Sequence, residues 1–416
     1  MKRSFTRLSV FVLGLVFTQS VFAQADTTKS TDENDRLIRE MSFVPLPVIA
    51  ANPANGFMYG LAPSATWLMG SETTTSRSSL VSTIIYTTKK QLILTFKTNV
   101  FLKDDGWNLM GDWRYFITSQ PTYGLGTGSQ SAKLIADGFP VDYDDSDFST
   151  GILEAQMMEF NYLRLHETAL KRFGDSRFFA GVGYHLDLHS KINDQLLNLD
   201  TIPPSITSHY AYSDDRGFDS EGYTLSGISL NGLYDSRDNT INPYSGRYAF
   251  VSLRINPEFL GSDQSSTMLW AEYRDYFGLS KKRPRHLLAL WAYGSFVTSG
   301  NVPYLDLPAV GWDQFGRSGR AYPQGRFRGG GVMYGELEYR FPLQKNSDTF
   351  GGVLFANATT ANNKDANIGL FEYVEPGVGV GWRIMLNKKA RTNLTIDYAW
   401  GAYGSHGFYL NVNETF

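Results

Sequence analysis

The chain has 416 residues, no Cys, 40 Gly and a formal net charge of −3. Without Cys it contains neither a disulfide scaffold nor a thiolate metal site. The slightly acidic balance, with no basic domain, argues against a nucleic-acid partner.

The first 23 residues have the three parts of a secretory signal peptide. Lys2, Arg3 and Arg7 form a positive start, residues 8–17 are apolar, and small residues end the segment at Ala23. A membrane-anchor helix is the weaker interpretation because the apolar run is short. Removal of 1–23 takes away three basic residues and no acidic one, so the net charge falls from −3 to −6. Residues 24–42 are polar and charged, and we expect them to form a short periplasmic tail.

From residue 43 to residue 416 the sequence consists of short alternating segments and turns, and no stretch reaches the roughly 18 apolar residues of a spanning helix. Aromatic residues make up 14% of the chain. In a secreted, Gly-rich chain this combination predicts an all-β fold, a transmembrane antiparallel β-barrel in the outer membrane of a Gram-negative bacterium. The expected strands are 57–69, 78–88, 91–103, 107–118, 153–166, 177–192, 221–234, 246–257, 266–279, 285–299, 332–343, 349–361, 372–386, 391–403 and 407–416.

These segments number 15, whereas a bacterial barrel has an even number of strands. We therefore expect 16 strands, with the missing one at 43–51 or 205–214; fourteen strands is the alternative. The long polar connections are 120–150, 193–220 and 300–331, and the other connections are short. Long loops on one side and short turns on the other are typical of outer-membrane barrels.

Segment 332–343 shows which face of a strand meets lipid. Its apolar residues, such as Leu337 and Tyr339, alternate with Glu336, Glu338 and Arg340. A cationic side chain facing lipid at the membrane midplane costs about 2–4 kcal/mol. The three charged residues are therefore expected to face the lumen of the barrel.

Several motifs resemble the BamA/TamA-type (bacterial surface antigen) family of outer-membrane proteins. Residues 234–239 (YDSRDN), followed by Pro243 and Gly246, are similar to a conserved turn of that family. Residues 319–328 (GRAYPQGRFR) and the strand after them resemble its signature loop, and 379–383 and 393–398 resemble its late strands. The last ten residues are similar to its C-terminal assembly signal. The resemblance covers about residues 220–416.

The resemblance implies a 300–331 loop that starts outside the cell and folds into the lumen, with five strands after it. It also implies a chain that assists insertion or translocation of polypeptide or lipid through a weak barrel seam. Three departures stand out: only about 18 residues occupy the place of the family's periplasmic POTRA domains, Ala321 replaces the motif Gly, and Asn357 replaces a carboxylate. We accordingly expect a POTRA-less member of the family.

Arg320 is the expected anchor of the loop, since a buried guanidinium needs acceptors. Asn357 is expected to supply one oxygen, with Glu336, Glu338 or Asp397 completing the pairing. The predicted loop anchor is Arg320, Ala321, Tyr322, Gly325 and Arg326, and the predicted receiving wall is Glu336, Glu338, Asn357 and Asp397.

The seam between the first and last strands is the other predicted site. Glu414 falls in the apolar register of the last segment, which indicates a weakly closed barrel. An unpaired strand edge is a template for another strand. The expected seam and signal residues are Phe408, Leu410, Val412 and Phe416. Expected partners are outer-membrane lipids, client outer-membrane proteins and a second copy of the chain.

Two alternatives remain open. His185, Asp187 and His189 alternate on one strand and could bind a metal or assist a hydrolase, but a polar lumen face explains them more simply. No Gly-x-Ser-x-Gly motif is present, so we expect no enzyme activity, cofactor or metal. The other alternative is a passive pore or structural barrel plugged by its 300–331 loop.

Overall fold

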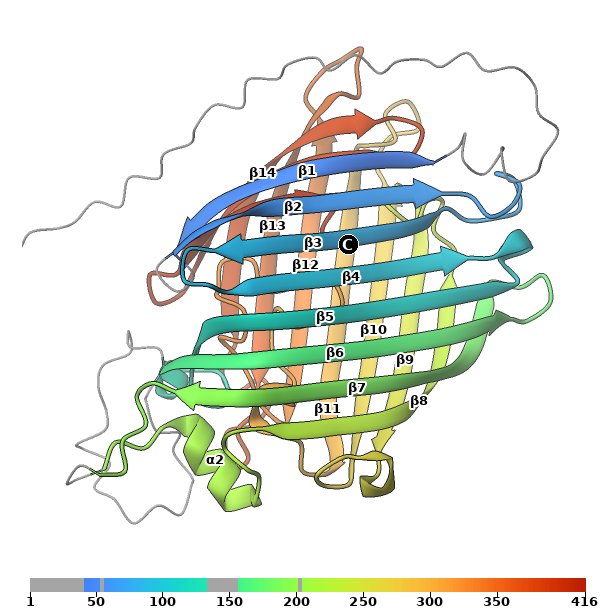
Figure 1. Cartoon of the computed structure of the whole chain (residues 1–416). Helices are drawn as coiled ribbons and strands as arrows, with labels where there is room; N and C mark the ends of the chain where they lie inside the picture. Colours follow the sequence, from blue (N-terminus) through green and yellow to red (C-terminus); the bar gives the residue numbers. More distant parts are fainter. Residues whose placement is uncertain (1–40, 53–55, 133–155, 201–203) are drawn as a thin grey trace, which may run out of the picture.

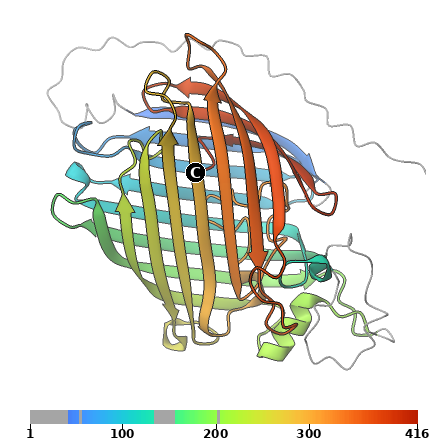
Figure 2. The ribbon, with the colours of Figure 1, turned by 180° about the vertical axis from the view of Figure 1, so that it is seen from behind.

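The computed structural model describes residues 41–52, 56–132, 156–200 and 204–416. The expected signal peptide and most of the expected tail lie outside this part of the chain. The described residues form one 16-stranded antiparallel sheet whose strands follow the order of the sequence. The sheet curls into a barrel (Figure 1), and the view from behind shows the wall made by the later strands (Figure 2).

The strands have these bounds: β1 (Ser42–Asn52), β2 (Gly56–Trp67), β3 (Ser78–Thr87), β4 (Leu92–Phe101), β5 (Trp107–Thr122), β6 (Gln156–Arg172), β7 (Phe178–Asp194), β8 (Tyr223–Asp235), β9 (Gly246–Asn256), β10 (Ser266–Gly278), β11 (Leu287–Gly300), β12 (Gly331–Pro342), β13 (Phe350–Ala361), β14 (Glu375–Asn387), β15 (Thr392–Gly401) and β16 (His406–Val412). The expected count of 16 is confirmed. The missing strand is β1, and the other candidate segment forms helix α2 (Ser208–Arg216), capped by the side chain of Thr207.

The alternation along β12 separates the two faces of the wall. Glu336, Glu338 and Arg340 are buried inside the barrel, whereas Leu337 between the glutamates is exposed on the outside. Most large apolar side chains that are exposed belong to the strands. An apolar exterior this extensive requires a membrane around it. In the part of the chain that the structure describes, no helix has the length and hydropathy needed to cross a membrane.

The connections after β5, β7, β11 and β13 lie at the same end of the barrel, because each follows an odd-numbered strand. The β11–β12 connection, residues 301–330, turns back into the lumen. Tyr304, Val310 and Phe327 of this loop are fully buried. They belong to two apolar clusters shared with the inner faces of the barrel wall. Five strands follow this loop, as expected.

The strand expected at 407–416 extends beyond the observed strand β16 (His406–Val412). β16 ends at Val412, Asn413 has a φ of 68°, and the four final residues are buried in the lumen. Glu414 therefore lies off the apolar register expected for it and pairs with Arg383, 2.7 Å between Oε2 and Nε. The ring of Phe416 lies 5.3 Å from that of Trp291. Internal charge pairing and aromatic packing outweigh continuation of the strand.

Candidate functional site: the lumenal loop and the seam

Arg320 is the centre of the contacts between the 301–330 loop and the barrel wall. Its side chain is 3% exposed. Nη2 lies 2.6 Å from Glu336 Oε1 and also pairs with Glu338, and Nη1 lies 2.7 Å from Asp397 Oδ2. The guanidinium carbon lies 3.5 Å from the ring centroid of Phe355. Three carboxylates and one aromatic face thus surround a single loop cation.

The network continues beyond Arg320. Arg340 Nε donates to Glu338 Oε2 over 2.6 Å, and Arg383 pairs with both Asp397 and Glu414. Burial alone would disfavour the charged guanidinium, but Glu336, Glu338 and Asp397 outweigh it and raise the pKa of Arg320 well above its ordinary value. Arg320 therefore stays cationic, and the network links the loop to β12, β14, β15 and the end of the chain.

Asn357 has a different role from the one expected. Its Nδ2 donates to the backbone carbonyl of Arg320 over 3.0 Å, and no oxygen of Asn357 bonds the guanidinium. The guanidinium already has three carboxylate partners, so the group still needing a partner is the buried Arg320 carbonyl. Only a donor satisfies a carbonyl. The Asn357 amide supplies that donor here, whereas an ionised carboxylate at this position has no hydrogen to donate.

The next two loop residues attach to the β15–β16 hairpin. Ala321 N–H donates to Tyr409 Oη over 2.8 Å, and its carbonyl accepts from Ser405 Oγ over 2.6 Å. Tyr322 Oη donates to the Pro376 carbonyl and accepts from Ala402 N–H. Ala321 has a φ of 105°, a left-handed conformation that favours Gly. The backbone turn therefore suits the Gly that Ala321 replaces.

The rest of the predicted anchor contacts loop residues, in the lumenal loop itself or in another connection, rather than the strands of the wall. Gly325 has a φ of 77° and donates its N–H to the Val310 carbonyl. Arg326 Nη1 donates to Ser131 Oγ over 2.8 Å, and its guanidinium lies over the ring of Tyr123 at 4.5 Å. The contacts of Arg326 join the lumenal loop to the β5–β6 connection.

The seam is open in the described part of the chain, where no hydrogen-bonded ladder joins β1 to β16. Phe408 and Leu410 are 57% and 43% exposed on the outside of β16. Val412 and Phe416 are buried and do not line the outer seam. Beside the short end of β16, Asn387 Nδ2 at the end of β14 donates to Ser42 Oγ at the start of β1 over 2.9 Å, and Lys389 pairs with Glu72 at 3.2 Å.

Arg317 was missed by the sequence interpretation. Its Nη2 donates to the Val412 carbonyl over 2.7 Å, and Nη1 donates to the Glu414 carbonyl. Arg383 was noticed only as part of a strand motif. Its position between outward-facing Trp382 and Ile384 could have identified it as a lumenal cation, but nothing local reveals that it pairs with Glu414.

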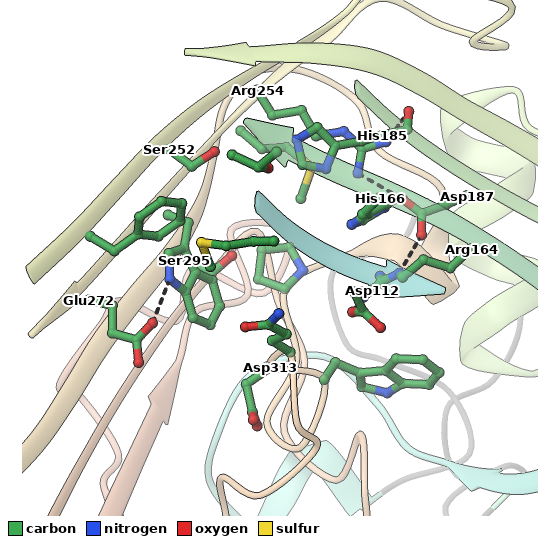
Figure 3. Close-up of a pocket in the computed structure, with 18 of the residues that line it drawn as sticks. Asp112, Arg164, His166, His185, Asp187, Ser252, Arg254, Glu272, Ser295 and Asp313 are labelled. Carbon is green, nitrogen blue, oxygen red and sulfur yellow. Dashed lines mark hydrogen bonds and ion pairs between the residues drawn. The ribbon is translucent and has the colours of Figure 1, made fainter. Parts of the chain in front are cut away.

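A second lumenal feature is a cavity of about 230 Å³ between the loop and the wall (Figure 3). His185 and Asp187 line it, as does His166 from β6. Asp187 accepts hydrogen bonds from Tyr162, Arg164, His166 and Arg254.

His185 bonds Ser229 Oγ at 2.7 Å, and His189 stacks on Tyr162 instead of joining the other two. Within the described ranges no group of three or more candidate ligands could hold a metal ion. The polar-face interpretation accounts for these contacts, and the absence of enzyme activity stays a prediction.

Comparison with known proteins gives two kinds of match. A family model described as the Omp85 superfamily domain matches residues 193–416. The structure is similar to that of BamA from Haemophilus ducreyi lacking POTRA domains 1–3, with 15% identity, a TM-score of 0.52, and coverage of 90% of this chain and 68% of that one. It is also similar to CdiB from Acinetobacter baumannii, with 12% identity, a TM-score of 0.50, and coverage of 90% and 66%. No curated protein matches the sequence. These structural similarities concern the fold.

Replacing Arg320 by Ala should leave Glu336, Glu338 and Asp397 with one buried cation fewer. We expect a loss of about 3–5 kcal/mol in the free energy of unfolding, the usual cost of removing one partner of a buried ion pair. Heat-induced loss of the folded electrophoretic form and limited proteolysis of the 301–330 loop would measure it. The matched control is Arg247→Ala, since Arg247 is 59% exposed in its pair with Asp275. Unchanged heat stability and protease resistance would refute the anchor role.

Replacing Ala321 by Gly should stabilise the barrel by about 0.5–1 kcal/mol, because the relief of left-handed strain exceeds the added flexibility of the unfolded chain. Thermal unfolding in detergent would measure the gain. Ala271→Gly on β10 is the control and should destabilise, since Gly weakens a strand interior. A loss of stability in Ala321→Gly would show that the turn is not strained.

Proposed function

Because the chain belongs to the Omp85 superfamily, we propose that it is an outer-membrane barrel of a Gram-negative bacterium that assists insertion or translocation of polypeptide through the seam between β1 and β16. The observation that carries the proposal is the missing ladder between these strands. Unpaired backbone groups in a membrane are costly. A barrel that leaves them unpaired along one line therefore has a strong tendency to accept another strand there.

The contacts of the lumenal loop support this role. A barrel could stay open by being poorly folded, but here the loop bonds β16 at two points, through Ala321 to Tyr409 at mid-strand and through Arg317 to Val412 at its end. The last hairpin is therefore held from the lumen side instead of by β1. This arrangement stabilises β16 while its outer edge stays available.

A passive pore or structural barrel is the second candidate. It is favoured by the filling of the lumen, where the 301–330 loop and residues 413–416 bury large aromatic side chains such as Phe327 and Phe416. That filling would serve as a plug. The two candidate functions differ in whether the seam has to open. An engineered disulfide across the seam tests this difference directly.

The chain has no Cys, so a single disulfide can lock the seam. Ser42 at the start of β1 contacts Asn387 at the end of β14, just past the short end of β16. The variant Ser42→Cys with Asn387→Cys should form a disulfide on oxidation that ties β1 to the last strands of the barrel. The assay follows folding of an unfolded client barrel into liposomes that contain this protein. We expect several-fold acceleration by the wild type and the reduced variant, and none by the oxidised variant.

Each single cysteine variant under oxidising conditions is the matched control and should behave as wild type. Arg320→Ala tests whether the loop anchor is needed as well. No acceleration by the wild type would contradict the proposed function and favour the plugged barrel, whose single-channel conductance should then rise on removal of the anchor. Acceleration that survives the lock would mean that the seam is not the route.

A further inference from the structure

The outer face of the wall from β7 to β12 carries small residues at positions where other strands carry large ones. One line of directly paired residues crosses these six strands: Ala180, Gly232, Val251, Ala271, Gly294 and Met333. Four of the six are Gly or Ala. On other strands the outward positions hold exposed rings such as those of Tyr115 and Trp382. The outer surface is therefore recessed along this line.

The recess is a groove of about 700 Å³, widened by Ala249 and Ala292 in the neighbouring line. Sites for small molecules have volumes of roughly 300–1,000 Å³. Figure 2 faces this part of the wall. Because β8 and β9 are the middle pair of the 16 strands, the groove lies on the far side of the barrel from the seam.

The groove spans one leaflet of a membrane. Five steps between neighbouring strands at about 4.8 Å cover roughly 24 Å. With strands tilted by about 40° this line climbs roughly 15 Å, half of a hydrocarbon core of about 30 Å. It begins beside Phe178 at the start of β7 and reaches the middle of β11 at Gly294. The start of β7 is at the end of the barrel opposite the 301–330 loop, which is the periplasmic end.

This lower end of the groove has the aromatic residues of a membrane interface. The rings of Phe178 and Tyr234 lie 4.9 Å apart, and both residues line the groove. Aromatic side chains gather at the level of lipid headgroups. An acyl chain in the groove would therefore have its headgroup at the periplasmic surface.

Arg247 provides a cation at that level. It begins β9 on the same outward face as Ala249 and Val251, and its side chain is 59% exposed. Its Nε lies 3.1 Å from Asp275 Oδ2, which also accepts from Tyr273 Oη over 2.7 Å. Among the described residues, neither Nη atom of Arg247 has a hydrogen-bond partner. The guanidinium is thus held in place with two nitrogens available, and a guanidinium matches the geometry of a phosphate.

The β10–β11 turn adds positive charge at the same end of the barrel. Residues 279–286 contain no acidic residue and four cations, Lys281, Lys282, Arg283 and Arg285. Arg283 Nη2 donates to the Gln344 carbonyl over 2.7 Å, and Arg285 donates to the Asp348 carbonyl. These acceptors are neutral, so the charge of the turn stays uncompensated and attracts anionic lipid headgroups.

We propose that this groove is a binding site for one anionic glycerophospholipid of the periplasmic leaflet. One acyl chain lies along the small residues from Ala180 to Gly294, and a phosphate oxygen accepts from the available nitrogens of Arg247. The placement of the barrel in an outer membrane rests on the proposed function, whereas the groove and its cations do not. A lipid held here fixes the depth of the wall that faces away from the seam.

Native mass spectrometry of the detergent-purified protein tests the site. The probes are dioleoylphosphatidylglycerol, which is anionic, and dioleoylphosphatidylcholine, which is zwitterionic. We expect one phosphatidylglycerol per barrel to survive detergent excess, with an apparent Kd several-fold below that for phosphatidylcholine. Since a ligand of the native state stabilises it, phosphatidylglycerol should also raise the temperature at which the folded electrophoretic form is lost.

Two variants separate the headgroup contact from the groove. Arg247→Gln removes the phosphate contact and should lower retention of phosphatidylglycerol several-fold, to the level of phosphatidylcholine. Ala271→Phe fills the groove and should lower retention of both lipids. Ala249→Phe is the second filling variant, should Ala271→Phe lose its folded form.

Each variant has a matched control on the same barrel. Lys103→Gln removes an exposed cation from another turn at the periplasmic end, and Ala356→Phe adds a ring at an exposed outward position of β13, outside the groove. Both should retain phosphatidylglycerol as the wild type does.

The contrary outcomes are specific. Equal retention of the two lipids by the wild type, or unchanged retention of phosphatidylglycerol in Arg247→Gln, would overturn the proposal. So would unchanged retention in a folded groove-filling variant. Dimers that exclude lipid and disappear in Ala271→Phe would identify a second copy as the occupant and overturn it as well.

The site and the proposed function fail separately. Accelerated client folding by a barrel that retains no phosphatidylglycerol would overturn the lipid site and leave the function standing. Selective retention that is lost in Arg247→Gln, in a barrel that does not accelerate client folding, would support the lipid site and contradict the function.

Discussion

The buried pairing of Arg320 with Glu336, Glu338 and Asp397 is the interaction on which the rest of the structure depends. It places a loop cation deep in the barrel, where three carboxylates of the wall would otherwise be buried without enough positive charge. Removing one member of such a set costs more than the set contributes as a whole. The network therefore acts as a specific lock on the position of the loop, and the loop in turn holds the last hairpin from inside.

This arrangement explains how the barrel is stable and incompletely closed at once. In an ordinary barrel the first and last strands satisfy each other's backbone groups. Here Pro45 and Pro47 of β1 have no N–H to contribute to such closure. β16 is instead held by the bond of Ala321 to Tyr409, by Arg317 and by the buried residues that follow Val412. Holding the last strand from the lumen leaves its outer edge unpaired without loosening the fold.

The sequence predicted the architecture well because barrel strands obey a period of two. Alternation around Leu337 was enough to assign both faces of β12, and the parity rule was enough to expect one more strand than was counted. β1 was not counted among the expected strands because of Pro45 and Pro47. Proline weighs against a strand except at positions such as a sheet edge, and β1 is an edge strand. The donor role of Asn357 and the inward turn after Val412 could not be predicted. Both depend on how deep the loop lies and on contacts between residues far apart in sequence, such as Arg383 with Glu414.

The central claim is that the outer edge of β16 is unpaired while its inner edge is held, and amide hydrogen exchange of the wild-type protein in detergent micelles tests it most directly. Exchange reports whether each N–H is hydrogen-bonded in the folded state. Asn413 N–H donates to Asn393 and Gly401 N–H to Ser405, so in this register the odd-numbered residues of β16 face β15. The account therefore predicts fast exchange at His406, Phe408 and Leu410 and slow exchange at Gly407, Tyr409 and Asn411. Slow exchange at all six would mean that a ladder to β1 closes the barrel, and would contradict the account.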